Sequence, residues 1–585
     1  MNFNGQSSVY EPGSAIDRRE LLLSLAAVGL TSGAMAETAL PQQAIRDKAL
    51  FFPTAPAPAR KLIVVDCHDA SPDEHLLLMS LQGLVNREKP RIYLIPNSRW
   101  IGDKSHEPPE HRRDEFWLAW LRKRRLVLDT ERISGDATGI ADLLTRFAHS
   151  YRGAVVPDPD LPVSNNIAIS IAGVEDLLVC TAALAENYHL QLKIDLRGRF
   201  AMNHQAMEWV WQTYRSKLNH QILATGHPKS HHALPWAFPV DYYIQNRVFV
   251  FWVTGVESLG SRKCNAKQEK AVIERILADL PPCIPVCGFT WAGTNEGMGE
   301  FEGVKMISEW GDVLIAIGIP NLSVHTGYHL SRLRQRPSRR ISPRLDRSKT
   351  YVTLTTSDGD ALGTFYNYHV DWFLAGRNRH FPIGIGVGPG AIDLIPAIAD
   401  WYYDQATPTN EFFCDVSGIG YMYPEHFANR RPNRDAVVLE FLSWTDRYMA
   451  RMDQHGLRPY QGDKQWLDLC SDRLSRLRYL VPGYGAENGD SNASSRTRSG
   501  LPVFNAVTPL VEVSNEKAFI SAIDKAAAVG QPAFLNGFVN ITLDNWTFLY
   551  ALPDIIKKLG DRYVFVTPSE LADLYLQSTE ASSNQ

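Results

Sequence analysis

The stretch Tyr351-Val-Thr-Leu-Thr-Thr356, which runs straight into Ser357-Asp358-Gly359-Asp360, is the most informative part of this sequence. Its β-branched and aromatic residues are typical of a buried strand, and the Ser, Asp and Gly residues are typical of the turn that ends one. Similar short runs recur at Pro382–Val387, Glu411–Val416, Arg478–Val481, Pro502–Ala506, Ala533–Leu535 and Tyr563–Thr567. Most of the intervals are long enough for a helix, so residues 351–580 are predicted to form a (β/α)7–8 barrel-like domain. A doubly wound open sheet is the competing layout.

The part of the chain before this barrel has the pattern of smaller α/β domains. Lys61-Leu-Ile-Val-Val-Asp66 and Arg91-Ile-Tyr-Leu-Ile95 are strand-like apolar runs, and Ser71-Pro72-Asp73-Glu74 between them is a typical helix start. Strand–helix–strand order indicates an α/β unit. We therefore expect a multidomain α/β chain. Its expected parts are a leader at 37–60, α/β domains or regions at 61–152, 153–240 and 241–330, and a solvated basic linker at 331–350.

The N-terminus has the pattern of an export signal. Arg18-Arg19 precedes the apolar run Leu21–Leu30, and Ala34-Met35-Ala36 has the small residues of a cleavage site. The run is too short to be a stable membrane anchor. Residues 1–36 are therefore predicted to be a twin-arginine-like signal peptide, with an ordinary secretory signal as the alternative. The mature protein is expected to be periplasmic or secreted.

The composition narrows the class of protein further. Apolar residues make up 44% of the chain and charged residues 21%, the usual balance of a globular protein. The formal net charge of −4 lacks the basic excess of a general nucleic-acid binder, so no nucleic-acid partner is expected. No segment after the signal predicts stable membrane insertion. The seven cysteines form no CxxC pair and are interpreted mainly as buried thiols.

Carboxylate side chains follow several of the predicted strands. Asp358 and Asp360 follow the first strand, Asp415 ends the third, and Glu487 follows the fourth. In a (β/α) barrel these strand ends form the active-site face, so the carboxylates are predicted to meet there. One carboxyl group can hold a proton as general acid while another, ionised, acts as nucleophile or base. Any single one of these residues is also compatible with an ordinary turn.

The segment Gly418-Ile-Gly-Tyr-Met-Tyr-Pro424 carries a second signal. Its two glycines allow a tight turn in which the backbone approaches a ligand. Tyr421 and Tyr423 are two residues apart, so in an extended segment they face the same side and can form a paired aromatic surface. The segment lacks the spacing and the third glycine of a dinucleotide-binding fingerprint. Tyr421 and Tyr423 are therefore candidates for hydrogen bonding to a sugar or stacking on it.

With this segment the chain resembles the GxGYxYP family, which is assigned to glycoside hydrolysis. The family is named for the motif that stands here as Gly418, Gly420, Tyr421, Tyr423 and Pro424. The likeness extends to Ser357–Asp360 and to segments of the N-terminal half, and so covers nearly the whole mature chain. The resemblance implies an exported multidomain bacterial protein with a barrel-like C-terminal domain that takes part in polysaccharide breakdown. The family favours Asn after the Ser-Asp-Gly-Asp motif, where this chain has Ala361.

The leading hypothesis is a glycoside hydrolase that acts on an extracytoplasmic polysaccharide through paired carboxylates, with no cofactor or metal. Asp360 and Glu487 are the preferred pair, with Asp358 and Asp415 as further candidates. A metal-dependent polysaccharide deacetylase is one alternative, because His227 and His231 have His-x-x-x-His spacing. A uronate lyase and a non-catalytic carbohydrate-binding protein of the cell envelope are the others.

Four more residues are candidate substrate contacts. Trp291 and Glu296 belong to a Gly-rich segment of the third α/β region, which reaches the cleft if that region packs over the barrel mouth. A solvated turn is the alternative interpretation of that segment. Asn536 and Trp546 lie at and after the sixth predicted strand, where barrel loops carry binding residues.

Overall fold

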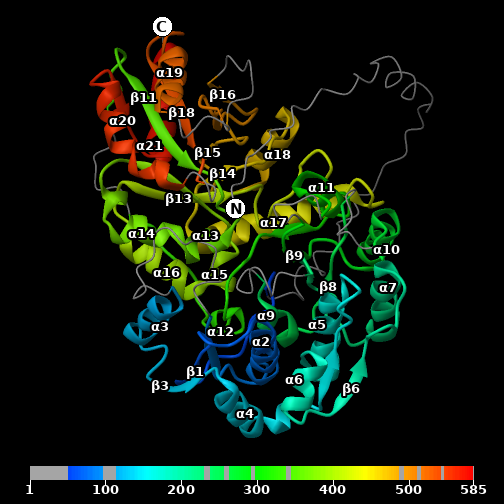
Figure 1. Cartoon of the computed structure of the whole chain (residues 1–585). Coiled ribbons are helices and arrows are strands. Elements are labelled where there is room, and N and C mark those ends of the chain that lie inside the picture. Colours follow the sequence, from blue (N-terminus) through cyan, green and yellow to red (C-terminus); the bar gives the residue numbers. More distant parts are fainter. Residues whose placement is uncertain are drawn as a thin grey trace, which may run out of the picture. The chain divides into compact units, whose positions relative to one another are not determined.

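The computed structural model describes residues 50–96, 113–228, 238–255, 263–290, 297–336, 344–485, 493–509, 516–541 and 546–583. The predicted signal peptide and residues 37–49 of the expected leader lie outside these residues. The described part is an α/β protein in which three small parallel sheets precede one larger sheet (Figure 1). The predicted fold class is therefore confirmed.

The first small sheet has the strand order β2-β1-β3, and all of its pairings are parallel. Helix α2 begins at a capping box in which the Ser71 and Glu74 side chains bind each other's backbone N–H, as the sequence predicts. The elements of this region are β1 (Lys61–Asp66), α2 (Pro72–Asn86), β2 (Ile92–Ile95), α3 (Arg113–Lys123), β3 (Asp129–Ser134), α4 (Ala137–Arg146) and η2 (Ala148–Ser150).

The second and third small sheets have the orders β5-β4-β6 and β10-β9-β7-β8, again all parallel. The boundary expected between residues 240 and 241 falls between β7 and β8 of the third sheet. The elements are β4 (Ala154–Val156), α5 (Ser164–Glu175), β5 (Leu178–Val179), α6 (Ala182–Asn187), β6 (Leu192–Asp195), α7 (Asn203–Tyr214), β7 (Leu223–Thr225), α9 (Val240–Gln245), β8 (Phe249–Phe251), α10 (Ala266–Asp279), β9 (Pro285–Gly288), α11 (Glu300–Glu309), β10 (Val313–Ile315) and α12 (Leu322–His325).

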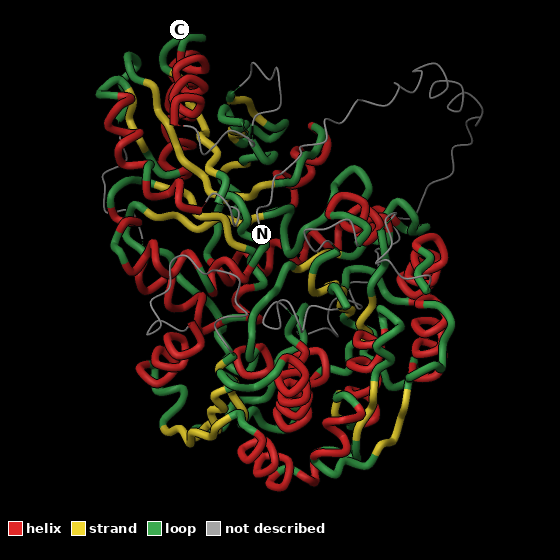
Figure 2. The backbone as a smooth tube through the Cα atoms, viewed as in Figure 1, coloured by secondary structure: helices red, strands yellow, loops and turns green. Residues whose placement is uncertain are grey.

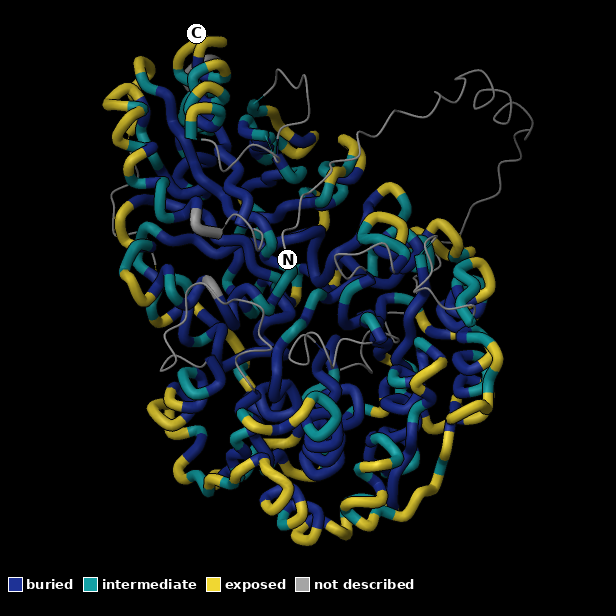
Figure 3. Tube along the Cα trace, viewed as in Figure 1, coloured by how far each residue is buried: buried dark blue, intermediate teal, exposed yellow. Residues whose placement is uncertain are grey.

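The larger sheet forms a nearly closed barrel. Seven of its strands are parallel neighbours in the order β17-β15-β14-β13-β12-β11-β18, and a parallel bridge from Ala506, just after β17, to Asn536 of β18 brings the two ends together. The seven strands are β11 (Thr350–Thr356), β12 (Ile383–Val387), β13 (Asn410–Asp415), β14 (Gly456–Arg458), β15 (Tyr479–Leu480), β17 (Pro502–Phe504) and β18 (Ala533–Val539). They are coloured yellow in Figure 2, with helices outside them, and are almost entirely buried (Figure 3).

Two strands in this domain differ from the sequence expectation. The expected strand at Tyr563–Thr567 is β19 (Tyr563–Phe565), which pairs only with the first half of β11 and is not one of the seven. Its place in the ring is taken by β14, a three-residue strand that the sequence did not reveal. The antiparallel strand β16 (Ser494–Arg496) lies at the outer edge of β17.

The helices of the barrel domain follow its strands. They are α13 (Leu362–Tyr366), α14 (Tyr368–Leu374), η4 (Arg377–Arg379), α15 (Ala391–Leu394), α16 (Pro396–Gln405), α17 (Arg434–Met452), α18 (Lys464–Arg473), α19 (Glu516–Ala527), η5 (Trp546–Tyr550), α20 (Leu552–Leu559) and α21 (Pro568–Ser583). Six of the seven cysteines are buried, Cys264 is partly exposed, and all seven are free thiols, as expected.

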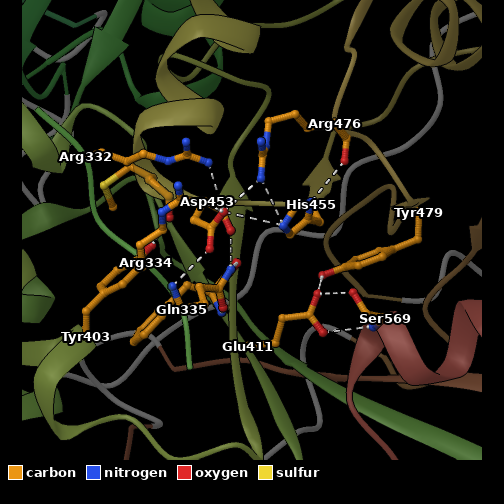
Figure 4. Close-up of polar contacts among 12 residues, drawn as sticks. Arg332, Arg334, Gln335, Tyr403, Glu411, Asp453, His455, Arg476, Tyr479 and Ser569 are labelled. Carbon is orange, nitrogen blue, oxygen red and sulfur yellow. Dashed lines mark hydrogen bonds and ion pairs between the residues drawn. The ribbon is translucent and has the colours of Figure 1, made fainter. Parts of the chain in front are cut away.

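The first residues of the expected basic linker are bound to the barrel. Leu333 is buried, and Gln335 exchanges hydrogen bonds with the backbone of Phe412, at 2.8 Å to its oxygen and 2.7 Å from its nitrogen. Arg332 and Arg334 reach Asp453 at 3.5 and 3.7 Å (Figure 4). Residues 331–336 are therefore held along the barrel instead of forming the expected solvated tether.

Candidate active site

The loop after β11 is held by its neighbours on both sides. The backbone N–H of Ser357 donates to Val539 at 2.9 Å, and its hydroxyl accepts the N–H of Ile541 at 2.9 Å. Asp358 has a positive φ of 55°, and a Cβ on Gly359 would overlap the backbone of Gly386 in β12. Only glycine fits this close approach. These contacts of the Ser-Asp-Gly-Asp segment therefore fix the backbone positions of Asp358 and Asp360.

A buried ion pair lies directly beneath this loop. Asp415, the last residue of β13, and Arg458, the last residue of β14, both have side chains that are 0% exposed. The Arg458 guanidinium donates to Asp415 Oδ2 at 2.9 Å, to the Thr356 oxygen at 2.6 Å and to Thr355 Oγ1 at 2.9 Å. The N–H of Gly359 also donates to Asp415 Oδ2, at 3.2 Å. The pair thus connects β11, β13 and β14 to the loop that carries the two other acids.

Arg458 is a residue of the candidate site that the sequence interpretation missed. Its guanidinium lies over the rings of Phe413, Tyr484 and Phe538, with 5.0, 5.4 and 5.0 Å to the ring centroids. Because the Arg458 guanidinium is enclosed by these rings and by the Asp415 carboxylate, water cannot solvate it in place of these contacts. The available signal was the run Gly456-Leu-Arg-Pro459, which follows a predicted long helix. This run is too short to show strand periodicity.

Asp358, Asp360 and Asp415 are brought together at the carboxyl ends of the strands. Tyr484, which follows β15, places its hydroxyl 3.5 Å from Asp360 Oδ1. Asp360 and Asp415 line one small cavity whose other walls are mostly apolar. Its apolar side chains are those of Phe52, Leu314, Ile315, Leu362, Leu394 and Ile419. The carboxylates therefore share surroundings of low polarity.

These surroundings shift the acidities of the three carboxyl groups upward. Burial raises the pKa of Asp358 to about 7, and the negative charges of Asp415 and Glu300 add to the effect. Burial also raises the pKa of Asp360 well above its usual range, with Asp358, Asp415 and Glu300 adding to it. Burial raises the pKa of Asp415 to about 6, against the opposing effect of Arg458. A proton is therefore retained in this cluster near neutral pH, most strongly at Asp360.

The raised acidities predict an unusual dependence of stability on pH. Because the folded-state pKa of Asp358 lies above the unfolded value, the folded protein binds more protons between about pH 4 and pH 7. The contribution of this group to the free energy of unfolding therefore falls as the pH rises through that window. Replacing Asp358 by Asn removes the titration, so the variant should gain roughly 1–3 kcal/mol over the parent between pH 5 and pH 8.

Thermal unfolding of both proteins at pH 5 and pH 8 checks this expectation. The melting temperature of Asp358→Asn minus that of the parent should be larger at pH 8 than at pH 5. Asp561→Asn, at an exposed position, is the control and should show no such difference. A pH-independent offset for Asp358→Asn would contradict the raised acidity.

The Gly418–Pro424 segment joins the barrel to the third α/β region. Tyr421 and Leu314 of β10 exchange two backbone hydrogen bonds of 2.9 Å in an antiparallel bridge. The N–H of Tyr423 donates to Ser308 Oγ of α11 at 3.0 Å. A Cβ on Gly420 would lie 2.7 Å from side-chain carbons of both Val313 and Ile315. This glycine therefore permits the contact between the two regions, a role different from the ligand approach that the sequence suggests.

A methyl group at position 420 should weaken this joint. Gly420→Ala overpacks the contact with Val313 and Ile315, which should cost about 1–3 kcal/mol. The measurement is the melting temperature, together with the rate of limited proteolysis. Ile315→Val shortens one of the clashing side chains and should restore part of the loss when combined with Gly420→Ala. Equal melting temperatures for the parent and Gly420→Ala would contradict this role.

The two motif tyrosines point to one acid of the third region. The Tyr421 hydroxyl donates to Glu300 Oε1 at 3.0 Å and lies 3.4 Å from the Tyr423 hydroxyl. Burial raises the pKa of Glu300, against the effect of the Tyr421 hydrogen bond. Tyr421 and Tyr423 are only 3% and 7% exposed. The hydroxyls do converge, but both rings are mostly covered by protein.

The remaining candidate residues fall into two groups. Asn536 is buried within the barrel wall, where it accepts from Thr355 Oγ1 at 2.8 Å and donates to the Phe504 oxygen at 3.3 Å. This places it in the barrel interior and not among exposed loop residues. Glu487, Trp291, Glu296 and the side chain of Trp546 lie outside the described part and stay predictions.

The described residues show no cluster suited to a metal ion. Among them, no group of three or more His, Cys, Asp and Glu side chains has the arrangement of a metal site. The His227 ring packs edge-on against Trp252, with 5.3 Å between centroids, and His231 lies outside the described residues. The His227–His231 pair of the deacetylase alternative therefore stays a prediction.

The fold and the site define a multidomain α/β protein whose barrel gathers acids at its mouth. The chain belongs to the GxGYxYP family. It matches "GxGYxYP_N 1st domain" over residues 61–149, "GxGYxYP_N second domain" over 151–218, "GxGYxYP third domain" over 221–327 and "GxGYxYP putative glycoside hydrolase C-terminal domain" over 348–576. The description of the C-terminal domain names glycoside hydrolases, a class of enzymes whose substrates are carbohydrates.

Two solved structures match this chain to different extents. A crystal structure described as a "putative hydrolase from Bacteroides thetaiotaomicron" has a TM-score of 0.70 and 19% sequence identity, covering 91% of this chain and 97% of its own. The peptidoglycan deacetylase PdaC from Bacillus subtilis has a TM-score of 0.22 and 15% identity, covering 40% of this chain and 96% of its own. No curated protein matches the chain. Among the described residues, no helix has both the length and the apolar character needed to cross a membrane.

Proposed function

We propose that this protein is a glycoside hydrolase that cleaves a polysaccharide outside the cytoplasm. The observation that carries the proposal is the placement of Asp358 and Asp360 on one loop at the barrel mouth, where the charge of Asp358 adds to the raised pKa of Asp360. Two carboxyl groups with different acidities are what glycosidic cleavage requires, one to donate a proton and one to act in its ionised form. The family description supports the same class of reaction.

The structure suggests a role for each described acid. Asp360, whose pKa is raised well above its usual range, suits the general acid that protonates the leaving oxygen. Asp358, with a pKa of about 7, is ionised in a large share of molecules at neutral pH and suits the nucleophile or base. Asp415 is fully buried and bound by Arg458 and Gly359, so we assign it a positioning role. Glu487 remains the second candidate for the ionised partner.

The experiment is an assay of reducing-end release from a panel of polysaccharides. The parent is expected to release reducing ends from at least one of them, and Asp360→Asn and Asp358→Asn are expected to do so far more slowly. Glu487→Gln in the same assay decides between Glu487 and Asp358 as the ionised partner. Release of acetate without chain cleavage would favour the deacetylase alternative, and full activity of all three variants would refute the assignment.

The stereochemistry of the product gives an independent test of the pair. Carboxyl groups about 5–5.5 Å apart act with retention of configuration, and groups about 6.5–9.5 Å apart act with inversion. Asp358 and Asp360 both belong to the segment Ser357–Asp360, whereas Glu487 follows β15 in the sequence. The anomer first formed can be identified by proton NMR and then compared with whichever pair mutagenesis selects.

A further inference from the structure

One aromatic side chain beside the site is exposed. Phe301, the second residue of α11, is 63% exposed. Every other Phe, Tyr and Trp residue whose burial is described is buried or partly buried. Burial of this ring against a ligand would remove apolar surface from water, so Phe301 is suited to pack against a bound molecule.

Phe301 is one end of a row of aromatic rings. It lies nearly parallel to Tyr423, with 6.5 Å between ring centroids and an interplanar angle of 22°. Tyr423 is 4.9 Å from Tyr460, and Tyr460 is 5.6 Å from Tyr484. The Tyr484 hydroxyl is in turn 3.5 Å from Asp360 Oδ1. We call the residues Phe301, Tyr423, Tyr460 and Tyr484 the aromatic row.

Phe301 is next to a residue that affects the pKa values of the acids at the barrel mouth. Glu300, its neighbour on α11, adds to the raised pKa values of both Asp358 and Asp360. The Tyr421 hydroxyl ties Glu300 to the barrel at 3.0 Å. The first turn of α11 is therefore part of the surroundings of the acids, although it belongs to the third α/β region.

We propose that Phe301, Tyr460 and Tyr484 of the aromatic row bind consecutive sugar units of the polysaccharide, with Phe301 as a platform away from the cleavage point, while the buried Tyr423 packs between Phe301 and Tyr460. This inference rests on the proposed function and adds that the substrate is a chain longer than a disaccharide. Aromatic faces bind the C–H faces of sugar rings, and a row of rings that ends at a general acid suits a polymer that passes through the acid site. Partly exposed Tyr460 and Tyr484 add hydroxyls that can bind sugar oxygens.

The test is electrophoresis in native gels that each contain one polysaccharide. The probes are xylan, glucomannan, laminarin, carboxymethylcellulose, polygalacturonate and chitosan. At least one should retard the parent, and Phe301→Ala should weaken that retardation roughly tenfold in apparent affinity, because the ring loses its burial against sugar. Phe301→Trp should restore it. Leu128→Ala, which removes an apolar side chain that is 50% exposed in the first domain, is the matched control and should behave as the parent.

Each other outcome has a defined meaning. Equal retardation of the parent and Phe301→Ala, or no retardation of the parent in any gel, would overturn the proposal. Loss of self-association by Phe301→Ala in sedimentation, with retardation unchanged, would assign Phe301 to a contact between copies of the chain and also overturn it. Asp360→Asn in the same gels separates the two proposals, since it should still be retarded while losing hydrolysis. Suppose that retardation depends on Phe301 but hydrolysis does not depend on Asp360. This result would support the binding role of the aromatic row and refute the catalytic role of Asp360.

Discussion

Replacing Asp360 by Asn is expected to lower the rate of polysaccharide hydrolysis by roughly 10²–10⁴-fold, the usual contribution of a general acid. The asparagine has nearly the same shape, so the small cavity that Asp360 shares with Asp415 should persist. What the variant loses is a group that holds a proton near neutral pH, as the raised pKa of Asp360 indicates. The measurement is kcat/KM for the polysaccharide that the parent degrades fastest.

The leaving group provides the control for this variant. The dinitrophenolate group of a dinitrophenyl glycoside leaves without being protonated. The Asp360→Asn substitution should therefore lower the rate of hydrolysis of this glycoside far less than the rate of hydrolysis of the polysaccharide. An equal loss on both substrates would indicate a damaged site and would contradict the role of Asp360 as acid. Asp554→Asn, on α20 outside the described cluster of acids, should retain the activity of the parent on both.

Replacing Arg458 by Met is expected to produce the largest loss of stability of any single change considered. The variant leaves Asp415 buried without its cation, which typically costs about 3–5 kcal/mol. The Thr356 oxygen and Thr355 hydroxyl lose their donor as well. For a domain of this size the melting temperature should fall by roughly 10 °C, as seen by differential scanning calorimetry.

Two further variants show whether the ion pair is the cause. Arg478→Met breaks the ion pair with Asp573, in which both side chains are exposed, and should cost no more than about 1 kcal/mol. Arg458→Met combined with Asp415→Leu removes both charges and should be more stable than Arg458→Met alone. If the double variant were the less stable of the two, the buried charge on Asp415 would not be the source of the loss.

The barrel was largely predictable because its strands are short apolar runs that end in turn residues. Six of the seven runs identified in the sequence overlap strands of the ring. Strand β14 was not predicted because Gly456–Arg458 has only three residues, one of them a glycine and one charged. Strand β19 was misplaced because its sequence resembles a barrel strand, while its pairing with the first half of β11 depends on the completed sheet.

In the site, the sequence predicted that Asp358, Asp360 and Asp415 lie together, while Glu487 lies outside the described residues. Their positions followed from the rule that parallel strands present their carboxyl ends at one face, which needs no knowledge of side-chain packing. Arg458 could not be found that way, since its role depends on a partner from another strand. The contact of Gly420 with Val313 and Ile315 was equally hidden, because it joins segments that only the folded chain brings together. Tyr421 and Tyr423 do share a face, but the acid they meet, Glu300, comes from the third region.

The central claim is that the acids at the barrel mouth hydrolyse glycosidic bonds, and digestion in oxygen-18 water tests it most directly. Mass spectrometry should show shorter chains in which each new reducing end carries one oxygen-18 atom, and Asp360→Asn should form them far more slowly than the parent. Intact chains that have only lost acetate, unsaturated fragments without the label, or the same rate for parent and variant would contradict the claim.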